Sequence, residues 1–345
     1  MKVALDISRM HPLSRSRGIG IYAKNLYQAL KKYTNLDIEL IEEKVDYKKF
    51  DLIHFPYFDL FTHTLPLKLP KLTVVTIHDL IPLQFPQNYP PGIKGKINWQ
   101  LQKLALKNVK SIISVSEIVK KDIEEILKIE GEKIKVVYSA PSTKFKKATD
   151  QSLTFKTRTK YQLPDEFVLF VGNVNWNKNI LNTAQACIDA SKNLVIVGGA
   201  FLDKTGLNHP EKESFKQFLE RFSNNDLIKI LGYVPTEDLN LIMSLAKCML
   251  FVSKYEGFGL PILEAQATKL PVITSNLSAT PEIAGEGALL VNPDNTKQIS
   301  EAIQKIFSSE ELRNKLIKKG GNNLKRFSWE KTALQTVKIY QNALD

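Results

Sequence analysis

Cysteine is scarce in this chain. Its two cysteines, Cys187 and Cys248, each lie inside an apolar pattern. Buried free thiols are therefore the expected state, and such thiols fit a reducing compartment. A disulfide between them stays open as an alternative, although no feature of the sequence supports it.

Long apolar runs are also missing. No uninterrupted run approaches the roughly 18 residues that a membrane-spanning helix needs. The first residues, Met1 to Asp6, already have the pattern of a strand, so we expect no signal peptide before the fold. These absences predict a cytoplasmic protein, either free in solution or peripheral at the inner face of the membrane.

Metal-binding patterns are absent as well. His11, His63 and His209 have no acidic or cysteine partner at the spacing of metal ligands. No Asp-x-Asp pair occurs, which removes the usual carboxylate clamp for a metal-bound nucleotide sugar. We therefore expect no metal site.

Positive charge is abundant, with a formal net charge of +12. This favours acidic partners such as nucleotide phosphates, anionic lipid or nucleic acid, and charge alone does not choose among them. The lysines are spread along most of the chain, as on solvated helix faces. Because no recognised module or aromatic-basic platform accompanies them, we expect no nucleic-acid partner.

The length of 345 residues favours two domains. Short runs rich in Val and Ile alternate with helical patterns, which is typical of parallel sheets covered by helices on both faces. The pattern lapses over residues 141–164, a polar stretch that we interpret as a linker. We expect an N-terminal domain over residues 1–150, a second over 151–325, and a helix over 326–345 that crosses back to the first. The expected strands are 3–7, 38–41, 52–55, 72–77, 111–115, 134–138, 167–171, 194–197, 228–231, 249–252, 272–274 and 289–291.

Two glutamates, Glu256 and Glu264, enclose a stretch with two glycines and Pro261 directly after an expected strand. Proline is favoured in the first turn of a helix, so Glu256 should lie on a loop and Glu264 in the opening turn of a helix. The backbone N–H groups between them form an anion site. Such a site suits a ligand with both hydroxyls and phosphates, and a nucleotide sugar is one.

Other polar residues follow strands, where ligands bind in open parallel sheets, here in a cleft between the domains. Gly18 and Gly20 would let the backbone approach a phosphate, or they form a plain helix entry. His78 would contact a hydroxyl or phosphate, or it only caps its strand. Lys178 would neutralise a diphosphate at a helix start, or it is simply solvated. His54 is expected to be structural or to line the cleft.

Together these segments resemble the retaining glycosyltransferases of family 4, which have the GT-B architecture: two Rossmann-like doubly wound α/β domains that face each other across a cleft. Within the family, the polysaccharide mannosyltransferases that use GDP-mannose are the most similar branch. The resemblance covers the whole chain and rests on residues 18–20, 74–79, 114–116, 172–178, 231–234 and 256–264.

The resemblance implies a role for each motif residue. Glu256 would contact hydroxyls of the donor sugar, Glu264 the ribose hydroxyls, Lys178 the diphosphate, and His78 the donor sugar near the scissile bond. Backbone groups near Gly20 would complete the phosphate site. The remaining donor-binding positions implied are Gly18, Gly172, Asn173, Tyr233, Val234, Gly257, Phe258, Gly259 and Leu260, with Tyr233 and Val234 beside the base.

One departure from the family pattern concerns charge. Family members commonly carry an Arg in the loop 172–178, at positions that are Asn173 and Asn177 here. A bidentate Arg balances a departing diphosphate better than a lone Lys. Arg15 or Arg17 would then supply the missing charge, or the enzyme is slow or binds its donor differently.

The implied reaction moves a hexose, best matched by mannose from GDP-mannose, to a hydroxyl of a glycan or lipid-linked acceptor on the first domain. The nucleotide sugar is a co-substrate, and no cofactor or covalent nucleophile is implied. A UDP-sugar donor and a non-catalytic nucleotide-sugar-binding protein stay open. Residues 93–107 mix Lys with apolar residues, as in a helix that lies on an anionic membrane or one that only covers the sheet.

Overall fold

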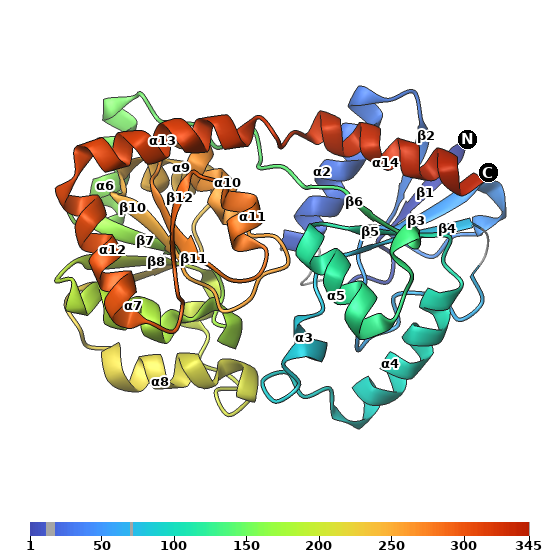
Figure 1. Ribbon diagram of the computed structural model, residues 1–345, viewed down its shortest axis with the longest axis horizontal. Helices are drawn as coiled ribbons and strands as arrows, with labels where there is room; N and C mark the ends of the chain where they lie inside the picture. The colour runs from blue at the N-terminus through green and yellow to red at the C-terminus, as the bar shows by residue number, and fades with distance from the viewer. Residues whose placement is uncertain (12–17, 70–71, 345) are drawn as a thin grey trace. The chain divides into compact units, whose positions relative to one another are not determined.

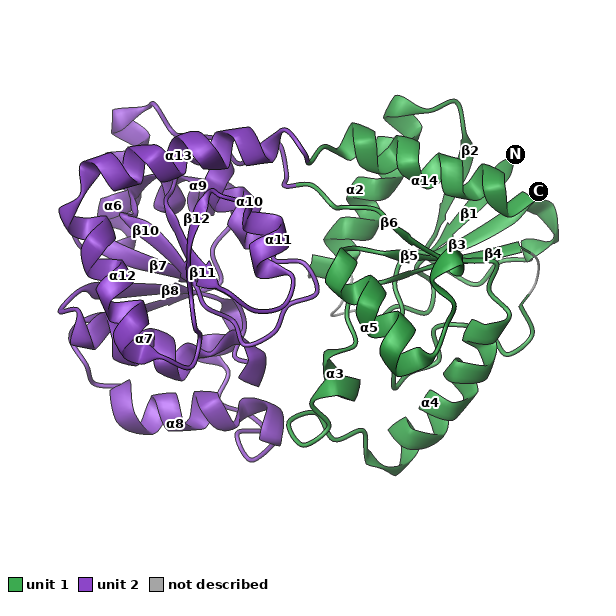
Figure 2. Ribbon diagram, in the orientation of Figure 1, with its two compact units in different colours: residues 1–140, 327–345 green, residues 141–326 purple. Residues whose placement is uncertain are grey.

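The computed structural model describes residues 1–11, 18–69 and 72–344. Arg15 and Arg17 lie outside this described part. The chain divides into two compact units, coloured separately in Figure 2: unit 1 holds Met1–Ala140 together with the chain from Phe327 onward, and unit 2 holds Pro141–Arg326. The first division thus falls ten residues before the 150/151 boundary expected from the sequence, and the second falls one residue after 325/326.

Unit 1 is built on a parallel sheet of order β2-β1-β3-β4-β5-β6. Because β1 lies between β2 and β3, the strand order reverses beside β1, and such a switch point is where open α/β sheets bind ligands. The strands are β1 (Lys2–Asp6), β2 (Asp37–Ile41), β3 (Leu52–Phe55), β4 (Leu72–Ile77), β5 (Ser111–Ser114) and β6 (Ile134–Val136). The helices are α2 (Gly18–Tyr33), α3 (Ile81–Gln84), α4 (Gly92–Lys107), α5 (Glu117–Leu127) and α14 (Trp329–Leu344).

Helix α14 belongs to unit 1 although it follows the whole of unit 2 in the sequence. It packs against α2, and the two helices lie on one face of the sheet while α4 and α5 lie on the other (Figure 1). The fully buried ring of His54 ties α14 to the sheet: its Nδ1 lies 2.6 Å from Tyr340 Oη and its Nε2 lies 2.8 Å from Thr76 Oγ1. Burial lowers the pKa of His54 to about 3, so the ring is neutral and structural.

Unit 2 has a second parallel sheet, of order β12-β11-β10-β7-β8-β9. The strands are β7 (Phe167–Val171), β8 (Asn193–Val197), β9 (Ile228–Gly232), β10 (Cys248–Phe251), β11 (Val272–Ser275) and β12 (Ala288–Val291). The helices are α6 (Gln151–Tyr161), α7 (Ile180–Asp189), α8 (Glu213–Phe222), α9 (Thr236–Leu245), α10 (Leu260–Ala267), α11 (Thr280–Ala284), α12 (Thr296–Ser308) and α13 (Glu310–Leu324).

The core of unit 2 lies on both faces of its sheet. Val168 and Phe170 of β7 pack into the layer with α7, α8 and α12, whereas Phe167 and Leu169 pack into the layer with α9 and α10. A strand buried on both faces reads as a continuous apolar run, which is why the sequence predicted every strand to within two residues at each end.

The predicted linker over residues 141–164 is wrong for its second half, which forms α6. The helix begins where the side chain of Asp150 accepts a hydrogen bond from Leu153 N, and it buries only Thr157. It is held to α9 by polar contacts, since Lys160 Nζ and Tyr161 Oη each lie 2.6 Å from Asp238. A helix without an apolar face gives no periodicity for sequence analysis to detect.

The predicted state of the cysteines is confirmed: Cys187 and Cys248 are both buried and free. Burial raises the pKa of the Cys248 thiol to about 12. Over the described ranges, no three His, Cys, Asp or Glu side chains gather in a group that could hold a metal ion. No helix in the same ranges combines the length and the apolar character needed to cross a membrane.

Candidate functional site

The loops of interest in unit 2 leave the carboxyl ends of β7 and β10. These two strands are neighbours, with β8 and β9 on one side and β11 and β12 on the other. The strand order therefore reverses between β7 and β10, which makes their carboxyl ends the topological switch point of the sheet. The loop 172–179 and the loop 252–259 start side by side there.

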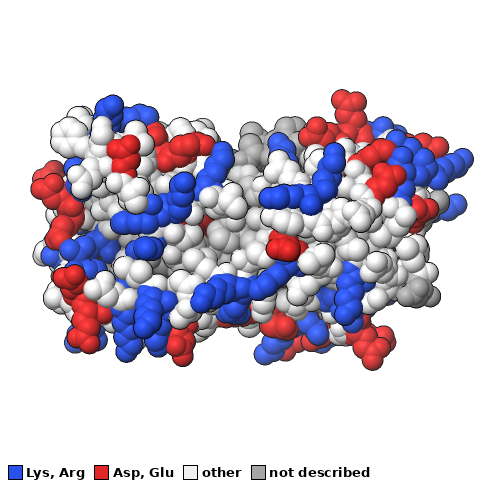
Figure 3. All heavy atoms as spheres, turned by 90° about the horizontal axis from the view of Figure 1, so that it is seen from above, with Lys and Arg blue, Asp and Glu red and all other residues white. Residues whose placement is uncertain are grey.

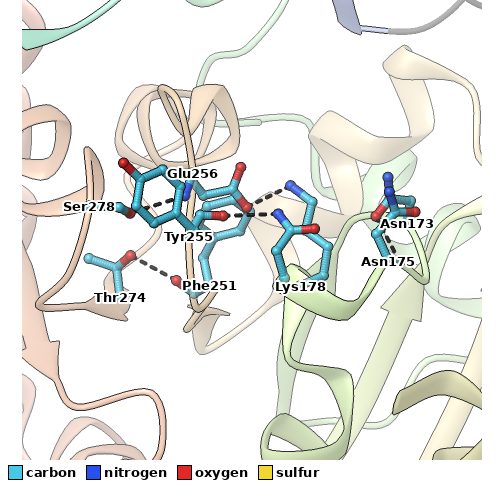
Figure 4. Close-up of polar contacts among 9 residues, drawn as sticks. Asn173, Asn175, Lys178, Phe251, Tyr255, Glu256, Thr274 and Ser278 are labelled. Carbon is cyan, nitrogen blue, oxygen red and sulfur yellow. Dashed lines mark hydrogen bonds and ion pairs between the residues drawn. The ribbon is translucent and has the colours of Figure 1, made fainter. Parts of the chain in front are cut away.

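Lys178 and Glu256 form an ion pair across these loops. Lys178 Nζ lies 2.6 Å from Glu256 Oε1, and the two side chains are only 17% and 10% exposed (Figure 4). The ammonium also lies 5.3 Å from the centroid of the Phe251 ring. Both charges are thus largely removed from water and neutralise each other.

Asn177 braces the two loops. Its side-chain Nδ2 donates to Tyr255 O at 2.9 Å, and its backbone carbonyl accepts from Lys254 N at 2.7 Å. On the far side, Glu256 N donates to Ser278 Oγ at 3.0 Å. Lys178 and Glu256 are consequently held in position by backbone contacts of their neighbours. The sequence analysis did not identify Ser278 as part of this arrangement.

Asn179 is a second buried amide that the sequence analysis missed. It is 2% exposed, and its Nδ2 donates to Val252 O at 3.0 Å and to Pro293 O at 2.7 Å. Its backbone is left-handed, with φ of 58°, a conformation that Asn tolerates better than most residues. Asn179 thereby fastens the start of α7 to the ends of β10 and β12.

Glu264 lies on α10, which begins after Gly259. The glycine is needed, because its φ is +101°, and Pro261 occupies the first turn as predicted. Glu264 is the fifth residue of the helix, so it lies about one residue past the opening turn in which it was predicted. Its side chain is partly buried, and burial alone raises the pKa of the carboxyl to about 7.

The ends of β7, β8 and β9 approach each other through glycines. A Cβ on Gly198 would lie 2.0 Å from the carbonyl oxygen of Gly172, so only glycine fits at position 198. Gly199 lies against Tyr233, which is 78% exposed, whereas Val234 is buried. The pair Gly198-Gly199 was missed, although two glycines directly after an expected strand are a visible signal in the sequence.

Gly18, Gly20 and His78 are the predicted site residues of unit 1 that the structure describes. Gly18 and Gly20 occupy the first turn of α2. A pocket of about 180 Å³ lies at the carboxyl ends of β1, β3 and β4. It is lined by Met10 and His11, by Ile19, by the loop 57–62, and by His78, Asp79 and Pro82.

His78 enters this pocket as a neutral ring. Its Nε2 donates to Pro56 O at 3.0 Å, because a carbonyl can only accept, so Nδ1 is the acceptor nitrogen. Tyr22 packs edge-on against the imidazole with ring centroids 4.7 Å apart. Burial lowers the pKa of His78 to about 4. Its predicted contact with a donor sugar stays a prediction, as does a phosphate contact near Gly20.

Two family models match this chain on either side of residue 150. The model "Glycosyltransferase Family 4" matches residues 12–143, and "Glycosyl transferases group 1" matches residues 154–323. The chain belongs to the family 4 glycosyltransferases. This glycosyltransferase carries its Lys178–Glu256 pair and Glu264 inside the second match, and its pocket inside or next to the first.

Curated relatives agree with this assignment. The "O-antigen chain mannosyltransferase B" of Escherichia coli is 29% identical over 86% of this chain and 75% of its own length. The "O-antigen chain mannosyltransferase RfbU" of Salmonella typhimurium is 29% identical over 71% of this chain and 63% of its own length. The match therefore spans somewhat less than two thirds of the second relative.

Solved structures establish the fold of this glycosyltransferase. The sucrose-phosphate synthase from Thermosynechococcus elongatus superimposes with a TM-score of 0.79 at 19% identity, over 99% of this chain and 98% of that one. The structure of WaaG, described as a glycosyltransferase involved in lipopolysaccharide biosynthesis, gives a TM-score of 0.71 at 15% identity, over 98% of this chain and 99% of that one. The architecture is GT-B, with one Rossmann-like domain in each unit.

Proposed function

We propose that this glycosyltransferase moves mannose from GDP-mannose to a hydroxyl of a glycan or lipid-linked acceptor and retains the anomeric configuration. The choice of mannose is supported by the names of the two O-antigen mannosyltransferases described above. The Lys178–Glu256 pair at the switch point of unit 2 carries the proposal, because it combines a cation for a diphosphate with a carboxylate for sugar hydroxyls.

When the donor binds, Lys178 and Glu256 would separate, and each would contact a different part of the nucleotide sugar. Lys178 Nζ would turn from Glu256 to the diphosphate, assisted by the N-terminus of α10. Glu256 would then accept hydrogen bonds from hydroxyls of the sugar. Glu264, whose carboxyl has a pKa of about 7, would gain the ribose hydroxyls as donors, and these would favour its ionised form.

The transfer itself requires one bond to break and one to form. The bond between C1 of the sugar and the diphosphate oxygen breaks, and the acceptor oxygen bonds to C1 on the same face. The acceptor proton passes to an oxygen of the departing diphosphate. In this mechanism no residue becomes covalently glycosylated, and neither a metal nor a cofactor takes part, since Lys178 and backbone N–H groups stabilise the leaving charge.

We propose that the acceptor enters the pocket of unit 1. The loop 57–62 offers aromatic walls at Tyr57, Phe58 and Phe61, while Asp59 and Asp79 add carboxylates for hydroxyls. The protein would act in the cytoplasm, with peripheral contact to an anionic membrane and without nucleic acid. The absence of a nucleic-acid partner is supported for the face drawn in Figure 3, where Lys and Arg side chains are scattered among Asp and Glu.

A calorimetric screen of GDP-, UDP-, ADP- and dTDP-sugars tests the donor, followed by donor hydrolysis without acceptor. We expect GDP-mannose to bind best. Glu256→Ala should remove most turnover and leave GDP binding intact, whereas Glu264→Ala should weaken GDP binding. If a UDP-sugar binds best, the proposed donor GDP-mannose is wrong. If a nucleotide sugar binds but is neither hydrolysed nor transferred, the protein is non-catalytic. A trapped glycosyl adduct on Glu256 would overturn the proposed mechanism.

A further inference from the structure

Helix α4 turns two amide side chains inward, beside Gly95, Ala105 and Leu106, and leaves aliphatic side chains outside. Two of the side chains that it turns inward are the amides of Asn98 and Gln102. Asn98 Nδ2 donates to Phe61 O at 2.9 Å. Gln102, which is fully buried, accepts from Thr64 N at 3.0 Å and from Leu65 N at 2.8 Å, and it donates to Leu65 O at 2.9 Å. These bonds fix which face of α4 points inward.

The opposite face of α4 carries exposed aliphatic side chains. Ile93, Ile97 and Leu104 are 83%, 58% and 57% exposed. Their spacing of four and seven residues places them within about 40° of one another around the helix axis. Soluble proteins bury such side chains where they can, so an aligned stripe of them indicates a contact surface.

Lysines flank this stripe, and no acid interrupts it. Lys94, Lys96, Lys103 and Lys107 are all exposed, and the sequence of α4 contains no Asp or Glu. Over the described chain, none of these four ammonium groups takes part in a salt bridge. Lys96, Lys103 and Lys107 lie along one side of the stripe and Lys94 on the other. An apolar stripe flanked by lysines fits a helix that lies in the interface of an anionic bilayer.

We infer that the outer face of α4 docks on an anionic membrane, with Ile93, Ile97 and Leu104 inserted among the lipid chains and the lysines on the headgroups. The inner face of the same helix holds Phe61, a wall of the pocket in unit 1. Docking would thus hold that pocket at the bilayer surface. Membrane docking is argued from α4 itself. Only the link between docking and a lipid-linked acceptor rests on the proposed function.

Vesicle flotation tests the surface, using the full chain with vesicles of phosphatidylcholine alone or mixed with phosphatidylglycerol. Two triple variants are compared: Lys94, Lys96 and Lys103 to Glu, and Ile93, Ile97 and Leu104 to Ser. A matched control changes three exposed lysines of α12 and α13 in unit 2 to Glu, namely Lys297, Lys305 and Lys318. Circular dichroism and calorimetric titration with GDP show whether each variant is folded and binds nucleotide.

We expect the natural protein to float with phosphatidylglycerol vesicles only, and each α4 variant to bind at least tenfold more weakly while the control is unchanged. Equal weakening of the control would overturn the inference by showing a general charge effect. Full vesicle binding by the Ser variant would also overturn the inference, because the aliphatic side chains would then not insert. If the natural protein self-associates and the Ser variant does not, the stripe is an interface between two copies of the chain, and this result too would overturn the inference. Failure of GDP binding with normal flotation would reject the proposed function alone.

Discussion

In the absence of nucleotide, the ionised carboxylate of Glu264 should lower the free energy of unfolding relative to its protonated form. The carboxyl has an ordinary pKa of 4.5 in the unfolded chain and a pKa of about 7 in the folded protein, because burial disfavours its charged form. Folding therefore takes up a proton between these values, and stability falls as the pH rises through this window. At about 1.4 kcal/mol per pH unit, the loss is about 3 kcal/mol at pH 8 and under about 1 kcal/mol at pH 5.

Glu264→Gln removes the titrating group and keeps its shape. The variant should melt roughly 6–12 °C above the natural protein at pH 8, for a domain of this size, and only slightly above it at pH 5. Differential scanning calorimetry of the full chain at both pH values measures this. The control Glu301→Gln lies on the exposed face of α12 and should show no such pH dependence. A difference for Glu264→Gln that is the same at both pH values would refute the reasoning.

Three further predictions concern the ion pair, the buried histidine and metal. Lys178→Met should leave the carboxylate of Glu256 without its cation, destabilise the protein by about 1–3 kcal/mol in urea unfolding, and reduce donor turnover at least 100-fold. Tyr340→Phe should cost about 1–3 kcal/mol by urea unfolding, because it leaves a buried nitrogen of His54 unpaired. Excess EDTA should leave donor turnover unchanged, and a loss restored by a divalent ion would contradict the metal-free mechanism.

The strands and the two-domain fold were predictable because parallel strands are buried on both faces. A run such as Phe167–Val171 has no polar side to solvate, so it stands out from any neighbouring sequence. Helix α6 was not predictable in the same way. Its packing depends on the contacts of Lys160 and Tyr161 with Asp238, and polar contacts across 77 or more residues leave no periodic signal.

The sequence predicted which loops carry the candidate site, but not which side chains of those loops contact one another. Lys178 and Glu256 each follow a strand, and that placement is visible in the sequence. Their ion pair requires β10 to lie beside β7, and the sequence alone does not give the order of strands in a sheet. The raised pKa of Glu264 depends likewise on the neighbours that bury it, which belong to the tertiary structure.

The missing Arg of the loop 172–178 has a structural consequence that can be tested. Asn177 is 4% exposed and its side chain is bonded to Tyr255 O, so Arg at this position would break the brace beside Glu256. Asn173 is exposed, and Arg there would add a cation to the same loop without displacing a buried contact. Asn173→Arg should therefore tighten GDP binding in calorimetry, whereas Asn177→Arg should weaken it and lower the melting temperature. Tighter binding by Asn177→Arg would show that this loop rearranges readily and that the brace does not position Lys178.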